Sequence, residues 1–143
     1  MALLQISEPG QSTAPHHHNL ACGIDLGTTN SLVASVMSGQ TRLISDQNNN
    51  SMLPSVVHYG QDKMTVGADA YQYTTTDPTN TIFSVKRYMG VDYSEASEFK
   101  NLPYKLVKNG NNVSFETSIG DVSAVEVSAS ILSTLKDRAE DAL

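Results

Sequence analysis

The chain has 143 residues, of which 39% are hydrophobic and 17% are charged, and this matches about one domain of a soluble globular protein. Its net charge of −6 argues against nucleic acid and anionic membranes as partners, because neither attracts an acidic surface. No apolar run approaches the ~20 residues that a membrane-spanning helix needs. The first six residues, 1–6, are too short for the apolar core of a signal peptide. We therefore expect a cytoplasmic protein.

Residues 1–19 predict a flexible leader, because they are rich in serine, proline and glycine. The leader ends in a histidine triplet, His16–His18, which offers ligands for a metal ion. The spacing of the triplet matches no structural zinc pattern, so the interpretation we favour is a solvated tail.

The first structured segment predicts a strand that ends in a carboxylate and turns into a second strand. Apolar residues alternate over 20–26, with the period of two that is typical of a β-strand. The segment 31–36 predicts the returning strand. The single cysteine, Cys22, lies in the first strand, and we expect it to be a buried apolar side chain rather than a reactive thiol.

The turn between these strands predicts a phosphate-binding site. Gly27, Thr28 and Thr29 offer successive backbone N–H groups and hydroxyls with no bulky side chain, which suits a phosphate group. Asp25 follows an apolar strand, where it could hold a magnesium ion through water. The alternative is a polar hairpin turn in which the aspartate bonds its own backbone.

Further elements follow from local patterns. We expect strands over 41–44, 56–59 and 64–66, a loop over 46–51, a short helix over 68–73 and a longer helix over 79–89. His58 lies among apolar strand residues, so a structural role is favoured over a catalytic one. The turn 109–112 between two apolar runs predicts a hairpin.

The last segment predicts a helix that begins at Ser128 as its N-cap. Its apolar residues Ile131, Leu132, Leu135 and Ala139 are expected on one side. Because the chain ends with this apolar stripe, we expect a truncated domain rather than a finished one.

Several segments in sequence order resemble one known family. The segment 23–31 looks like the first phosphate-binding segment of the heat-shock protein 70 (DnaK-type) chaperones, which belong to the actin-like ATPase superfamily. The segments 53–55, 79–90 and 127–141 are similar to further motifs of that family. The leader 1–10 resembles the branch of the family that is specialised for iron–sulfur cluster assembly.

This resemblance implies an α/β fold, the N-terminal part of an actin-like (ribonuclease H-like) nucleotide-binding domain. It places first-lobe strands in about 20–54, a smaller inserted subdomain in about 55–127 and the start of a first-lobe helix in 128–143. It further implies that Gly27–Asn30 bind the phosphates of ATP, that Asp25 lies near Mg²⁺ and that Lys86 is catalytic.

The role of Lys86 also has support from chemistry. Phosphoryl transfer needs positive charge where charge develops on oxygen, and a lysine supplies it. The alternative is that Lys86 and Arg87 only satisfy the last carbonyl groups of a helix. The sequence departs from the family at 48–50, where an acidic-Gly-x-Arg stretch is usual, and at Val91, where an arginine is common.

The resemblance predicts an ATP-dependent chaperone that couples ATP hydrolysis to binding and release of client peptides. It implies a J-domain co-chaperone and an iron–sulfur scaffold or unfolded client as partners, and no nucleic acid or membrane. The 143-residue chain alone is expected to be inactive. The alternatives are a sugar-kinase-type phosphotransferase of the same superfamily and a non-enzymatic, truncated interaction module.

Overall fold

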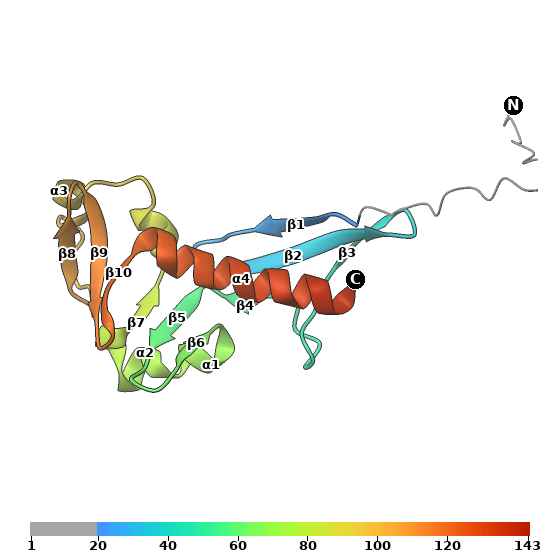
Figure 1. Cartoon of the computed structure of the whole chain (residues 1–143), viewed down its shortest axis with the longest axis horizontal. Helices are drawn as coiled ribbons and strands as arrows, with labels where there is room; N and C mark the ends of the chain where they lie inside the picture. Colours follow the sequence, from blue (N-terminus) through green and yellow to red (C-terminus); the bar gives the residue numbers. More distant parts are fainter. Residues whose placement is uncertain (1–19) are drawn as a thin grey trace, which may run out of the picture.

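The computed structural model describes residues 20–143, in which three antiparallel sheets and one long helix form an elongated α/β structure (Figure 1). The strands are β1 (Cys22–Asp25), β2 (Asn30–Met37), β3 (Gln40–Leu43), β4 (Leu53–Pro54), β5 (Val56–Tyr59), β6 (Met64–Val66), β7 (Thr81–Phe83), β8 (Leu106–Asn109), β9 (Asn112–Thr117) and β10 (Gly120–Ser123). The helices are α1 (Ala68–Tyr71), α2 (Tyr73–Thr76), α3 (Tyr93–Ala96) and α4 (Ala124–Ala142), with 3₁₀ turns η1 (Pro78–Asn80) and η2 (Val85–Tyr88). The predicted leader and its histidine triplet lie outside the described residues.

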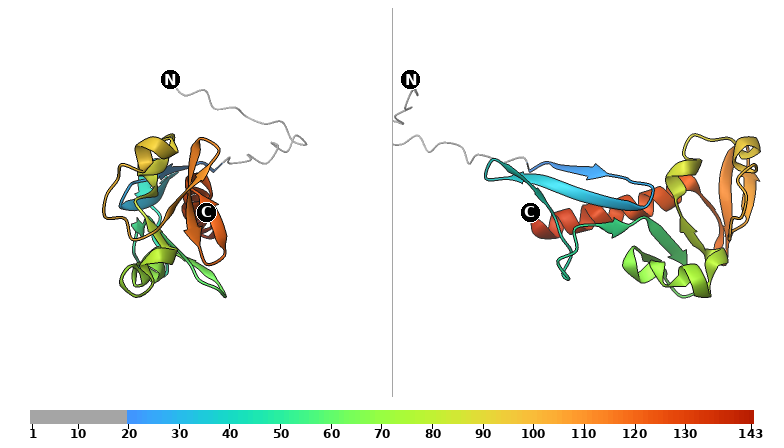
Figure 2. Two further views of the ribbon diagram at one scale, coloured as in Figure 1. Left: turned by 90° about the vertical axis from the view of Figure 1, so that its left-hand side faces the viewer. Right: turned by 180° about the vertical axis from the view of Figure 1, so that it is seen from behind.

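Strand β2 is the centre of the first sheet. It pairs with β1 on one side and β3 on the other, and its first residues pair with β4. Ser31, Val33 and Ser35 are buried, while the residues between them point to the opposite face. The view from behind in Figure 2 shows β1 and β2 running along α4, which packs against both strands. The predicted strand over 31–36 is confirmed.

The second sheet has the order β6–β5–β7 and carries α1 and α2 beside it. His58 of β5 is buried, and its Nε2 donates a hydrogen bond to Asp77 Oδ2 at 2.9 Å. This hydrogen bond is the main reason why the pKa of the Asp77 carboxyl is lowered. The His58 ring also stacks on Tyr73, with ring centroids 3.9 Å apart. His58 is therefore satisfied inside the fold, as its position in an apolar strand predicts.

The third sheet, β10–β9–β8, contains the predicted hairpin. Asn109 pairs with Asn112, and Gly110 in the turn has a φ of 61°, which glycine adopts without strain. The fully buried Phe115 packs edge-on against Tyr88 and Tyr104. Burial raises the pKa of the Tyr104 hydroxyl above its usual value.

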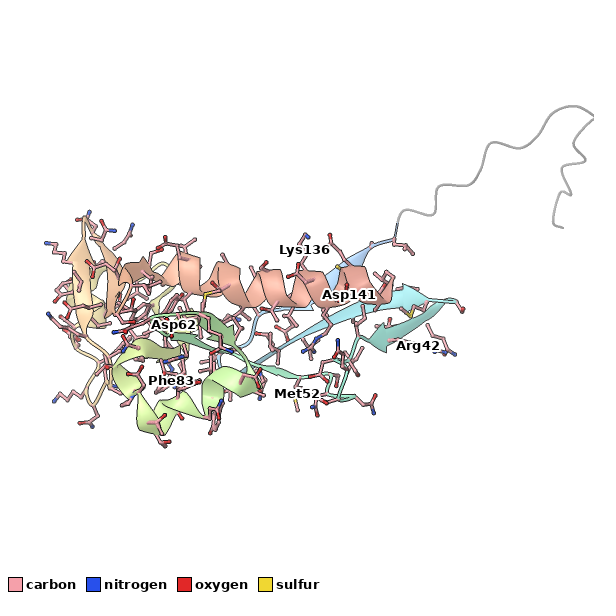
Figure 3. All side chains as sticks on the ribbon, turned by 60° about the horizontal axis from the view of Figure 1, so that its bottom comes forward. Arg42, Met52, Asp62, Phe83, Lys136 and Asp141 are labelled. Carbon is pink, nitrogen blue, oxygen red and sulfur yellow. The ribbon has the colours of Figure 1, made fainter. Side chains whose placement is uncertain are left out.

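Helix α4 joins the sheets into one body. It contacts β2, β5 and β9, and it runs along most of the length of the molecule (Figure 1). Val127, Ile131 and Leu135 are fully buried in the common core, whereas Leu132 is 36% exposed and lies off that stripe. Lys136 and Asp141 lie on the exposed side of the helix (Figure 3). Within residues 20–143, no helix combines the length and apolar character that crossing a membrane requires.

The predicted helix over 79–89 is wrong. Its apolar residues have helical spacing, but the segment forms η1, then β7, then η2. Thr81 and Ile82 pair with β5, so tertiary pairing of these β-branched residues overrides the helical pattern. Ser84 follows with a φ of 55°, and this left-handed conformation separates β7 from η2.

The predicted start of the last helix is also wrong. The N-cap is Ser123, whose hydroxyl accepts the amide of Glu126, while the Glu126 carboxylate accepts the amide of Ser123. This reciprocal capping box fixes the start of the helix. Ser128 lies one turn inside, where its hydroxyl donates to the carbonyl oxygen of Ala124 at 2.8 Å.

The expected burial of Cys22 is a third error. Cys22 lies in β1 as predicted, but its side chain is exposed. Within residues 20–143, β1 has a neighbouring strand on one side only, so its outer edge and part of its surface stay open. Apolar alternation locates a strand but does not show how completely the strand is covered.

The capping box gives a testable expectation for α4. Ser123→Ala removes the acceptor for the Glu126 amide and should cost about 1 kcal/mol of local stability at the helix N-terminus. Ser133→Ala, an exposed serine in the middle of the same helix, should instead stabilise α4 by ~0.5 kcal/mol or less. Amide hydrogen exchange of the first helical turn measures both. Equal effects of the two substitutions would show that the cap does not hold the helix end.

Candidate functional site

The turn from β1 into β2 is shaped by Gly27. Asp25 pairs with Leu32, and the chain reverses through residues 26–31. A Cβ atom at Gly27 would collide with the backbone carbonyl oxygen of Asn30, so only glycine fits here. The backbone of Gly27 therefore packs directly against that of Asn30, and the turn carries the side chains of Thr28 and Thr29.

Two backbone donors of the turn remain available for a ligand. The sequence predicts three, but the Gly27 N–H donates to the Ser31 hydroxyl at 3.2 Å. Among the hydrogen bonds of residues 20–143, none uses the amide of Thr28 or Thr29 as donor. These amides and the two threonine hydroxyls form a small group of donors of the kind that binds oxyanions.

A cavity of about 300 Å³ lies beside these donors. Its lining brings the turn together with β5, the α1–α2 segment and the end of β7: Thr28, Thr29, Ser55, Val56, Tyr71, Thr74, Phe83 and Ser84. Figure 3 shows Phe83 beside the α1–α2 region. The cavity thus joins a polar floor to apolar walls, the usual composition of a small-ligand site.

Ser84 is a lining residue that sequence reasoning missed. Its left-handed backbone, with a φ of 55°, is uncommon for a residue other than glycine. Such conformations concentrate at functional sites, where the surrounding structure holds them. Neither its residue type nor its spacing marked Ser84 in the sequence, because the conformation depends on the pairing of β7 with β5.

Lys86 and Asn30 are not in the lining of this cavity. Lys86 is exposed on η2, two residues beyond Ser84, and makes no ion pair within residues 20–143. Its turn is anchored by the buried Val85 and Tyr88 and packs against α4. Asn30 begins β2, pairs with Pro54 and lines a separate cavity of about 610 Å³.

Asp25 is an exposed residue at the end of β1. The cost of burying an unpaired carboxylate, on which the sequence argument relied, therefore does not apply to it. In residues 20–143, no three His, Cys, Asp or Glu side chains gather as a metal-binding cluster. A single carboxylate beside phosphate oxygens is nevertheless a common way to hold Mg²⁺, which keeps several water ligands.

Comparison with known proteins identifies the family of this chain. The family model described as Hsp70 protein matches residues 21–143. This chain belongs to the Hsp70 family, whose fold is the actin-like ATPase nucleotide-binding domain.

Individual relatives align with nearly all of the chain. Proteins described as "Chaperone protein HscA homolog" are 54% identical in Aliivibrio salmonicida, over 98% of this chain, and 53% identical in Acinetobacter baumannii strain AYE, over 100% of it. A protein of the same description from Actinobacillus pleuropneumoniae serotype 5b is 50% identical over 100% of this chain. The chain spans 23% of the length of the first two relatives and 24% of the third.

The close packing at Gly27 can be tested with Gly23 as a control, a glycine four residues earlier in β1. Gly27→Ala should distort the turn, because the new methyl group has no room beside the Asn30 carbonyl. Gly23→Ala in β1 should be tolerated, since a Cβ there meets nothing within 4 Å. The exchange rate of the Ser55 amide, which donates to the Thr29 carbonyl oxygen, should rise at least about tenfold in the first variant, the equivalent of ~1.4 kcal/mol of local stability. Unchanged rates in Gly27→Ala would contradict the steric account.

Proposed function

We propose that this chain is the N-terminal part of the nucleotide-binding domain of an ATP-dependent molecular chaperone. The observation that carries the proposal is the pair of unused amides at Thr28 and Thr29, on a turn that admits only glycine at position 27, in a chain of the Hsp70 family. The match to Hsp70 over residues 21–143 favours this function over the sugar-kinase alternative.

The turn would hold the terminal phosphates of ATP. Thr28 and Thr29 would donate their amide and hydroxyl hydrogens to phosphate oxygens, and Gly27 would let the backbone approach closely. Asn30, the last of the four proposed phosphate-binding residues, would contribute through its backbone at the start of β2. Fixed donors of this kind need no reorganisation when charge develops in the transition state, which is how a rigid site accelerates phosphoryl transfer.

Asp25 fits a role in binding Mg²⁺ through water. Its exposed carboxylate lies two residues before Gly27, on the strand that leads into the turn. When bound, the ion neutralises negative charge on the phosphate oxygens. Asp25 would accept hydrogen bonds from the water ligands and so orient them.

Lys86 would stabilise charge on the transferred phosphoryl group. Its ammonium group is exposed and unpaired within residues 20–143, and its long side chain starts two residues beyond the cavity lining. The anchored η2 turn fixes the start of that side chain, while the side chain itself is free to reach a bound nucleotide.

The relatives extend the proposal to the complete protein. Since they are described as HscA homologs, we propose a role in iron–sulfur cluster assembly or transfer, with a J-domain co-chaperone and a scaffold or unfolded client as partners in the cytoplasm. ATP turnover would be linked to client binding and release as a coupling between two sites. The chain covers 23% of such a relative, so we propose that it does not hydrolyse ATP alone.

The catalytic role of Lys86 is testable in the full-length protein. Lys86→Ala should lower kcat by roughly 100- to 1,000-fold while ATP affinity changes little, because a charge aimed at the transition state contributes mainly there. Single-turnover hydrolysis and equilibrium ATP binding measure the two quantities. The control is Lys100→Ala, an exposed lysine after α3. If binding and hydrolysis fall together, or neither changes, Lys86 is not catalytic.

The magnesium role of Asp25 is tested in the same protein. Asp25→Asn should weaken magnesium-dependent nucleotide binding by about 10- to 100-fold with the fold intact, because it removes the charge that orients the water ligands. Asp62→Asn, at an exposed turn residue on another strand pair (Figure 3), should leave binding unchanged. Titration of nucleotide affinity against Mg²⁺ concentration is the measurement. If nucleotide affinity of Asp25→Asn depends on Mg²⁺ as in the wild type, Asp25 is only a turn residue.

A further inference from the structure

Ser55 holds the phosphate-binding turn from outside the turn itself. It follows β4, it is 1% exposed, and its amide donates to the Thr29 carbonyl oxygen at 2.8 Å. Its hydroxyl donates to the Gly27 carbonyl oxygen at 2.9 Å. One residue, 28 positions away in the sequence, therefore contacts the turn on both sides of Thr28.

Ser31 completes a closed ring of hydrogen bonds. Its hydroxyl oxygen accepts the Gly27 N–H and lies 2.9 Å from the Ser55 hydroxyl. Each hydroxyl has one hydrogen to donate, and that of Ser55 goes to the Gly27 carbonyl. Ser31 must then donate to Ser55. The ring runs from the Gly27 N–H through Ser31 and Ser55 and back to the Gly27 carbonyl.

We propose that Ser31 and Ser55 are positioning residues, which set the Gly27–Thr29 turn in the shape that binds phosphate. The inference rests on the proposed function, because it concerns how the same turn meets its nucleotide. The ring occupies both backbone groups of Gly27 and leaves the Thr28 and Thr29 amides as the unused donors. A donor displaced by about 1 Å can cost ~100-fold in rate, so a buried anchor of this kind acts on chemistry as well as stability.

The competing interpretation is that these serines only satisfy buried polar groups, which almost all proteins do. The two interpretations differ in what the substitutions change. If the hydroxyls act as one relay, removing either opens the ring and slows hydrolysis, and removing both adds little further loss. If they only satisfy buried polar groups, the substitutions lower the stability of the fold and leave the hydrolysis rate of the folded protein unchanged.

The experiment uses the full-length protein and MgATP, with single-turnover hydrolysis and equilibrium binding as readouts. Ser55→Ala and Ser31→Ala should each lower the hydrolysis rate by about 10- to 100-fold. The double variant should fall no more than about twofold below the slower single variant. Ser35→Ala is the matched control, since Ser35 is also buried in β2 and donates to a backbone carbonyl, that of Ala21, at 2.7 Å. Its rate should stay within about twofold of wild type.

A readout without nucleotide separates this inference from the proposed function. The amide of Gly27, bonded to the Ser31 hydroxyl, and the amide of residue 55, bonded to the Thr29 carbonyl oxygen, should exchange faster in Ser55→Ala and Ser31→Ala but not in Ser35→Ala. If wild-type protein neither binds nor hydrolyses MgATP, the proposed function fails whatever the serines do. If wild type is active and the two serine variants match Ser35→Ala, or their losses add, the positioning role fails. Should Ser55→Ala not fold, Ser31→Ala alone decides by the same two readouts.

Discussion

The backbone of the turn from β1 to β2 is the constraint on which the rest of the structure depends. Gly27 packs so closely on the Asn30 carbonyl that no side chain fits, and both of its own backbone groups are bonded by buried serines. This arrangement requires β2 to lie between β1 and β4, because β4 delivers Ser55 to the turn. The sheet therefore supports the candidate site, which consists of only a few backbone donors.

Helix α4 connects this local arrangement to the rest of the fold. Its buried stripe packs on β2, which follows the turn, and on η2, which carries Lys86. The turn and Lys86 thus pack on the same helix, although Thr29 and Lys86 lie 57 positions apart in the sequence. Positioning of donors and charge on a common support is what phosphoryl transfer demands of a protein.

Local patterns predicted the elements that local interactions determine. The strands around the turn and the hairpin at Asn109–Asn112 follow from alternation and turn chemistry, and both are confirmed. The segment 79–89 was mispredicted, because pairing with β5 converts Thr81–Phe83 into a strand. Ser84 and Ser55 lie in segments that resemble family motifs, but the sequence did not place them at the candidate site, since their positions there arise from tertiary contacts.

The most direct test is a crystal structure of the full-length protein with magnesium and a non-hydrolysable ATP analogue. The account predicts phosphate oxygens about 2.7–3.2 Å from the amide nitrogens of Thr28 and Thr29, with the Gly27 N–H still bonded to Ser31. It would be contradicted by a nucleotide whose phosphates bind elsewhere while the Thr28 and Thr29 amides remain in contact with solvent.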